Sequence, residues 1–161
     1  RTAAPACQAK QRFPDRIRAD APEMYDDVAD LLADPRPLAD ALLAMPTTFL
    51  HGDWKMGNLG SHGDGRIVLL DWDRPSIGPP TVDLGLYLAV NCDRLPGSKD
   101  ATLVRYREHL EARGWSTAAW WDRQVPLALL GAFVQLGWSK AGQDSELAWW
   151  APILAQARRL L

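Results

Sequence analysis

The sequence is poor in cysteine and contains no long apolar run. Its 161 residues include only two cysteines, Cys7 and Cys92, whose positions match neither a metal site nor a disulfide framework. No stretch approaches the roughly 20 consecutive apolar residues that span a bilayer, and no segment resembles a secretion signal. These absences predict a cytoplasmic protein without a membrane partner.

The sequence also lacks an excess of positive charge. The 18 lysines and arginines are outnumbered by 20 aspartates and glutamates, which gives a net charge of −2 and a sequence pI near 5.9. Proteins that hold a nucleic-acid backbone need a basic surface. We therefore expect no nucleic-acid partner.

What is present fits one globular domain. Hydrophobic residues make up 47% of the chain, and its length lies close to the usual domain size of roughly 100 to 150 residues. Residues 1–20 contain two prolines, mixed charge and no hydrophobic period, which indicates a linker or lead-in segment. Residues 21–161 are expected to form the domain.

Hydrophobic spacing, prolines and caps predict the main elements. Ser98 is expected to cap the helix that follows it. A further helical stretch is expected to open at Ser116 and to kink or restart at Pro126, and Pro152 is expected to disturb the terminal helix unless that helix begins there. The predicted helices otherwise cover 21–33, 37–45, 81–92, 99–113 and 145–161, and the predicted strands cover 47–50 and 66–72. This pattern predicts a mainly α domain, α+β overall, with a small β element.

The eight tryptophans admit two interpretations. They can pack helices together, or they can form an aromatic wall that stacks on a sugar or a cationic amine. We expect helix packing for the six in the C-terminal part, which are Trp115, Trp120, Trp121, Trp138, Trp149 and Trp150.

A polar loop, "HGDWKMGN" at residues 51–58, joins the two predicted strands. Loop composition alone favours an ordinary surface turn. A hairpin between residues 58 and 71 would, however, bring Asn58 close to Asp71, and an amide with a carboxylate is a suitable protein share of a Mg²⁺ site. Asp53 would then lie beside the metal and be free to accept a proton, an arrangement that phosphoryl transfer requires.

Three motifs in this region resemble those of the aminoglycoside phosphotransferase and choline kinase family, small-molecule relatives of protein kinases. "HGDWKMGN" is similar to the family's catalytic loop, and "LLDW" to its metal-binding strand end. "GPPTVDLGLYL" resembles the segment that follows. The motifs occur in family order over residues 49–88.

The resemblance implies roles for several residues. Asp53 would be the catalytic base, and Asn58 and Asp71 would hold Mg²⁺ and so contact the nucleotide. Lys55 would contact the transferred phosphate. His51 and Asp83 would give structural support, His51 by ordering the loop and Asp83 by bonding back to it.

The same resemblance implies a reaction and its cofactors. A phosphate group would pass from ATP or GTP, with Mg²⁺, to a hydroxyl of a small molecule such as an aminoglycoside, choline or a sugar. The fold would be the helical C-terminal lobe of a protein-kinase-like enzyme.

The N-terminal nucleotide-binding lobe of that fold has no counterpart in residues 1–50. The family's glycine-rich turn and strand lysine are missing there, so we expect the chain alone to be inactive and to bind nucleotide weakly. Three explanations stay open: a fragment of a longer kinase, a half-protein completed by a partner chain, and a non-catalytic binding or interaction module. A metal-dependent phosphohydrolase is a fourth, although it would need a more self-contained metal site.

Overall fold

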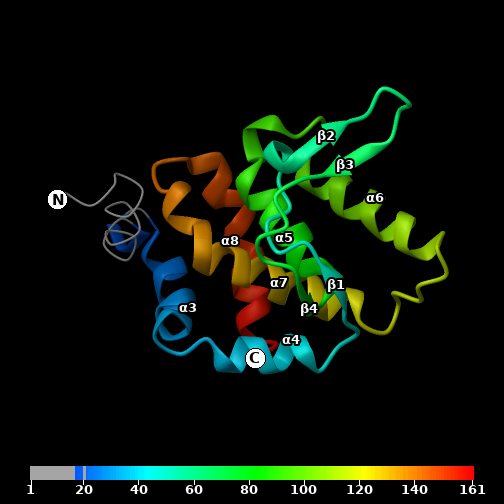
Figure 1. Ribbon diagram of the computed structural model, residues 1–161. Coiled ribbons are helices and arrows are strands. Elements are labelled where there is room, and N and C mark those ends of the chain that lie inside the picture. The colour runs from blue at the N-terminus through cyan, green and yellow to red at the C-terminus, as the bar shows by residue number, and fades with distance from the viewer. Residues whose placement is uncertain (1–16, 20) are drawn as a thin grey trace.

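Helices make up most of the fold (Figure 1). The computed structural model describes residues 17–19 and 21–161. Its helices are α3 (Pro22–Ala33), α4 (Arg36–Leu43), α5 (Pro80–Val90), α6 (Lys99–Glu111), α7 (Trp121–Leu136) and α8 (Asp144–Arg158), with 3-10 turns η1 (Met56–Asn58), η2 (Cys92–Arg94) and η3 (Gly137–Ser139). The predicted mainly α, α+β class is confirmed. Within the described residues, no helix is long and apolar enough to cross a membrane.

The predicted lead-in over residues 1–20 lies outside the described residues except for 17–19. Of these, Ile17 is fully buried and belongs to the hydrophobic core. Cys7 also lies outside them, and Cys92 is a free thiol.

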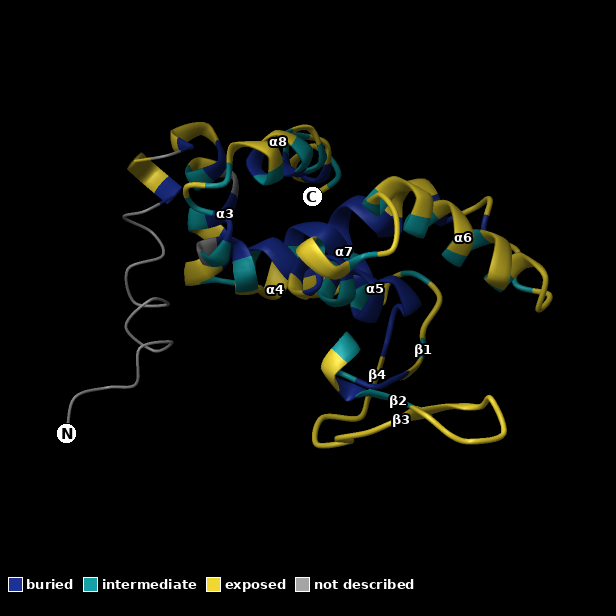
Figure 2. Ribbon diagram, turned by 90° about the horizontal axis from the view of Figure 1, so that it is seen from above, coloured by how far each residue is buried: buried dark blue, intermediate teal, exposed yellow. Residues whose placement is uncertain are grey.

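The strands form two short antiparallel pairs on one side of the helices (Figure 2). β1 (Thr48–Leu50) pairs with β4 (Ser76–Gly78), with Phe49 opposite Ile77. β2 (Leu59–Ser61) pairs with β3 (Ile67–Leu69) in a hairpin. The polar loop therefore runs from the end of one pair to the start of the other.

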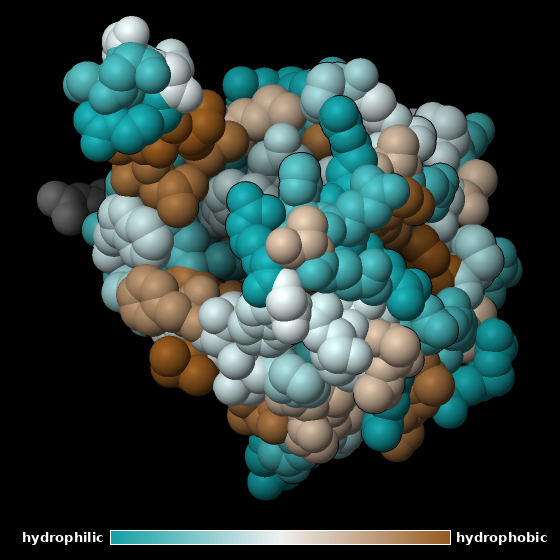
Figure 3. Space-filling model, turned by 90° about the vertical axis from the view of Figure 1, so that its right-hand side faces the viewer, coloured by the Kyte–Doolittle hydropathy of each residue, from teal (hydrophilic) through white to brown (hydrophobic). Residues whose placement is uncertain are grey.

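Large apolar side chains are exposed along these strands, which is unusual for a helical protein with a well-filled core. Hydrophobic atoms gather beside the hydrophilic tip of the hairpin on the face shown in Figure 3. Phe49 and Ile77 are 61% and 68% exposed, and the ring of Phe49 stacks on Trp72. We call the exposed apolar residues of the strands and the segment after β3 the apolar band; they are Phe49, Ile67, Val68, Leu69, Leu70, Trp72 and Ile77.

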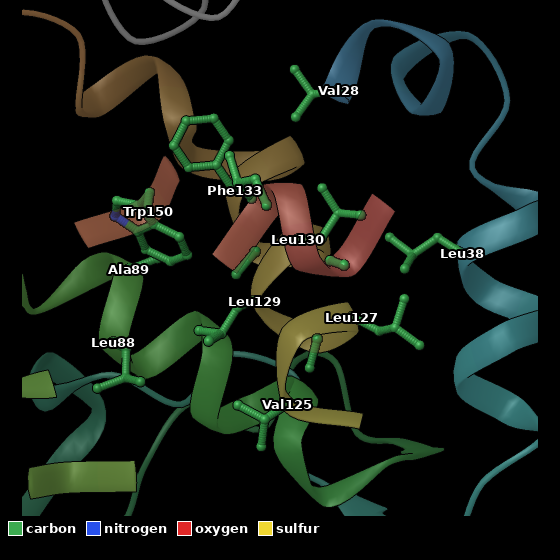
Figure 4. Packing of buried hydrophobic residues seen from close by; sticks show 14 of the residues in the cluster. Val28, Leu38, Leu88, Ala89, Val125, Leu127, Leu129, Leu130, Phe133 and Trp150 are labelled. Carbon is green, nitrogen blue, oxygen red and sulfur yellow. The ribbon is translucent and has the colours of Figure 1, made fainter. Parts of the chain in front are cut away.

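The core is built around α7, which packs against α5, α8, α4 and α3. Phe133 and Trp150 lie against each other with ring centroids 5.4 Å apart (Figure 4). Trp120 and Trp121 are buried as well, and Trp115 and Trp149 pack partly buried against the core. The helix-packing interpretation holds for these five tryptophans; the side chain of Trp138 lies outside the described part.

No helix restarts at Pro126 or begins at Pro152. Pro126 lies inside α7 and Pro152 inside α8, and both helices continue through them. A proline inside a helix costs about 3 kcal/mol, but residues 124–130 of α7 are all buried, and this burial outweighs the lost hydrogen bond.

Other boundaries differ by smaller amounts. Ser116 does not cap α7, because that helix begins only at Trp121. The strand predicted over 66–72 is shortened to β3, since the chain turns away from the hairpin at Asp71. Ser98 caps α6 as predicted, with its hydroxyl accepting from the backbone N–H of Ala101 at 3.0 Å.

Candidate active site

The polar loop is fastened to the helical core by one carboxylate. Asp83 lies in the first turns of α5 and is 8% exposed. Its Oδ2 accepts from the backbone N–H of His51 at 2.7 Å, and its Oδ1 accepts from that of Gly52 at 2.9 Å. Since α5 packs on α7, these two bonds fix the start of the loop to the most buried part of the protein.

His51 links the loop to the strand that leads to Asp71. Its Nδ1 accepts from the backbone N–H of Asp53 at 3.3 Å, so Nε2 carries the proton that is donated to the carbonyl of Leu70 at 2.9 Å. The ring also lies 4.4 Å from that of Trp72. Because both ring nitrogens are engaged, the geometry favours a structural role for His51 over proton transfer.

Gly52 permits a close approach that no other residue would allow. Its φ is +80°, and a Cβ at this position would lie 2.0 Å from the backbone oxygen of Arg74. The loop and the segment before β4 are thus in backbone contact.

Asp53, Lys55 and Asn58 form a hydrogen-bonded group. Oδ2 of Asp53 accepts from Lys55 Nζ at 2.5 Å and from Asn58 Nδ2 at 3.1 Å. Asn58, which is buried, also donates to the backbone oxygen of Asp53 at 2.9 Å. Partial burial raises the pKa of Asp53, but the hydrogen bonds from Lys55 and Asn58 and the charges of Lys55 and Arg74 together outweigh it and hold the pKa below its ordinary value. The carboxyl group is therefore ionised at neutral pH.

The hairpin brings Asn58 next to the chain that carries Asp71. The backbone N–H of Leu70 donates to the carbonyl of Asn58 at 2.9 Å, which extends the β2–β3 ladder by one step. Asp71 follows with φ of +64°, and it is the one non-glycine residue with positive φ in the described part of the chain. Such a conformation costs about 1–2 kcal/mol, and strain of this kind is concentrated at functional sites.

The donor atoms here suit a hard cation. Within residues 17–19 and 21–161, no hydrogen bond engages Oδ1 of Asn58 or the carboxylate of Asp71, and no group of three or more His, Cys, Asp or Glu side chains could hold a metal. One amide oxygen and one carboxylate fit Mg²⁺, which is bound through one or two protein oxygens and keeps its other positions for water and phosphate.

A family-level comparison agrees with this arrangement. The model of the phosphotransferase enzyme family matches residues 2–121, which include the loop, the hairpin and α5. The chain belongs to this family. No curated protein and no solved structure matches it.

The general chemistry of this phosphotransferase is therefore kinase-like phosphoryl transfer. The fold links five of the six residues that the sequence singled out by hydrogen bonds, and it places Asp71 next to Leu70, which bonds to His51 and Asn58. Asp53, Lys55 and Asn58 are in direct contact, and His51 bonds both to Asp53 and to the residue before Asp71. The assigned roles of the six residues stay predictions.

The sequence did not identify two residues that shape the phosphotransferase loop. Asn91, which is buried at the end of α5, accepts from the backbone N–H of Met56 at 3.1 Å and donates to the carbonyl of Tyr87 at 2.8 Å. Arg74 contributes a backbone carbonyl against Gly52 and a positive charge near Asp53. Asparagine is common at the ends of helices, so the sequence alone does not set Asn91 apart from an ordinary cap. Its contact with the loop does.

Replacing Asp83 tests the fastening of the loop. Asp83→Asn keeps one acceptor oxygen and turns the other group into a donor that faces an N–H. We expect a loss of about 1–3 kcal/mol in the free energy of unfolding and a large shift of the Gly52 amide resonance. Urea unfolding and amide NMR measure these effects. Asp93→Asn, at an exposed position in η2, is the matched control, and equal stability of the two variants would contradict the assignment.

Proposed function

We propose that this phosphotransferase moves the γ-phosphoryl group of ATP or GTP to a hydroxyl of a small molecule such as an aminoglycoside, choline or a sugar. One observation carries the proposal: the loop and the hairpin form a single unit. This unit holds an ionised Asp53 in contact with Asn58, and it places Asp71 directly after Leu70, which makes the last hydrogen bond of the β2–β3 ladder. Phosphoryl transfer depends mainly on positioning and on charge stabilisation, and this unit offers groups for both.

Asp53 is the group that orients the acceptor. Its Oδ2 is engaged by Lys55 and Asn58, whereas no hydrogen bond of the described residues uses Oδ1. Oδ1 can therefore accept a hydrogen bond from the acceptor hydroxyl. As the new bond from that oxygen to the γ-phosphorus forms and the bond to the β-phosphate oxygen breaks, the hydroxyl proton passes to the Asp53 carboxylate.

Asn58 and Asp71 are the residues that would hold Mg²⁺, through Oδ1 and a carboxylate oxygen. The ion would neutralise phosphate charge when bound. Lys55, whose ammonium group lies against Asp53, adds a positive charge where the transferred phosphoryl group would pass.

The apolar band supports a further part of this proposal, that a nucleotide-covering lobe docks beside the loop. Trp72 and Phe49 are exposed next to the catalytic group, and large exposed apolar patches mark interaction surfaces. None of the four described strands contains a lysine that could bind the nucleotide phosphates. We propose that the lobe comes from outside the described residues, as a further part of the same protein or as a partner chain, and that activity requires it.

Replacing the base tests the proposed reaction. In the complete enzyme, Asp53→Asn should lower kcat by roughly 10² to 10⁴ while the protein stays folded, because the amide can no longer take the proton. The assay follows labelled γ-phosphate from ATP into a panel of aminoglycosides, choline and sugars. Asp93→Asn serves as the control and should keep the wild-type rate. Retention of most of the rate by Asp53→Asn would refute the proposal.

Replacing Lys55 tests its charge through pH. Partial burial raises the pKa of Asp53, and Lys55 opposes this effect through a hydrogen bond and its charge. Lys55→Met removes both, so the pKa of Asp53 should rise. Asp53 acts when ionised, and the acidic limb of the kcat/KM profile should therefore move to higher pH, together with a lower plateau. Lys99→Met, which removes a lysine between α6 and α8, is the comparison. A profile and plateau that do not change would show that Lys55 has no role in the reaction.

A further inference from the structure

A cavity of about 440 Å³ lies on the helical side of the catalytic loop. Its walls come from α3, α4, α5, α7 and the end of β1. The inner wall is apolar and buried, and it includes Leu31, Leu38, Leu42, Leu50, Ala128 and Ala132. Figure 4 shows Leu38 pointing from α4 into the interior of the molecule. The exposed lining residues, Arg74 and Ser76 among them, mark the mouth.

The size of this α4–α7 cavity argues against a packing defect. Protein interiors contain few voids larger than a water molecule, whereas small-molecule sites measure roughly 300 to 1,000 Å³. At about 30 Å³ for each water-sized group, the cavity has room for roughly fifteen such groups. Gly131 also lines this space, and a Cβ there would lie in ordinary contact with Leu38, at 3.5 Å, so the position has room for a side chain. An apolar cavity of this kind binds apolar molecules in preference to water.

The charged residues in the cavity lining indicate which class of ligand the cavity can bind. Asp83 also lines the cavity, but its two oxygens are taken by the backbone of His51 and Gly52. Arg74 is exposed, and no ion pair within 4.0 Å engages it in the described part of the chain. Arg74 is thus a cationic residue in the lining, and a positive charge beside an apolar cavity suits an acidic group on an apolar body.

We propose that the α4–α7 cavity binds a small amphiphilic anion, with its apolar body among the leucines of α3 and α4 and its acidic group on Arg74. Binding of such a ligand goes beyond the proposed phosphoryl transfer and does not depend on it. The lining includes Gly52 of the catalytic loop and also Arg74 and Asp83, which contact Gly52, so an occupant lies against the residues that position this loop.

Two fluorescent probes test the proposal on the full chain. 8-Anilinonaphthalene-1-sulfonate carries an acidic group, and N-phenyl-1-naphthylamine has the same aromatic body without it. Wild-type protein should bind both. Arg74→Gln should weaken the sulfonate roughly tenfold, the effect expected for losing a charged hydrogen bond, and should leave the neutral probe within about twofold.

Filling the cavity should remove both probes. Gly131→Leu extends a side chain from α7 into the cavity. Ala39→Trp places a large side chain over the cavity from α4, and because Ala39 is exposed, this change should affect folding little. Each should weaken both probes by more than roughly tenfold, with circular dichroism and thermal unfolding confirming the fold. Ala148→Leu, on the exposed face of α8, and Phe49→Ser, in the apolar band, are controls that should bind as wild type.

Three results would overturn the proposal. Wild-type protein that binds neither probe has no such site. Wild-type affinity in both Gly131→Leu and Ala39→Trp, or loss of affinity in Phe49→Ser, would place the probes elsewhere. Equal effects of Arg74→Gln on the two probes would show that Arg74 does not recognise the acidic group. Phosphoryl transfer is not measured in any of these assays, so their failure leaves the proposed function untouched.

Discussion

The rest of the site depends on two hydrogen bonds, which the backbone N–H groups of His51 and Gly52 donate to the carboxylate of Asp83. A carboxylate that accepts two backbone N–H groups in a buried place is among the stronger polar contacts in proteins. It joins the loop to α5, and α5 is held by α7, whose buried face makes the core. The loop thereby takes its position from the best-packed part of the molecule.

Further contacts carry that position to the reacting groups. His51 reaches Asp53 through Nδ1 and the Leu70 carbonyl through Nε2, so one ring sets the spacing of the two chain segments that bear Asp53 and Asp71. Asn91 holds the far end of the loop at Met56. Two left-handed residues, Gly52 and Asp71, lie within this network. The strain at Asp71 persists because its neighbours fix the backbone on either side.

Local signals in the sequence were enough to predict much of the architecture. The spacing of apolar residues predicts the helices, Ser98 is predicted as a cap, and a hairpin is predicted between residues 58 and 71, where β2 and β3 pair. A helix restart does not occur at Pro126, because the burial of α7 overrides the local preference of proline for a break.

Features that arise from distant segments could not be read from the sequence. The backbone oxygen of Arg74 against Gly52, the contact of Asn91 with the loop, and the cavity between α4 and α7 all depend on how the helices pack. A side chain type or a spacing gives no sign of them. The residues of the loop itself were identifiable because their chemistry requires particular functional groups at short range.

Paramagnetic relaxation by Mn²⁺, a substitute for Mg²⁺, is a direct test of the metal site formed by Asn58 and Asp71, because it requires neither the acceptor nor the nucleotide. The site described here predicts that Mn²⁺ broadens the side-chain amide signals of Asn58 and the backbone signal of Asp71 first, and that Asp71→Asn abolishes this broadening. If these signals persist while others broaden, or if Asp71→Asn responds as the wild type does, Asn58 and Asp71 do not form the metal site and the account of the loop is wrong.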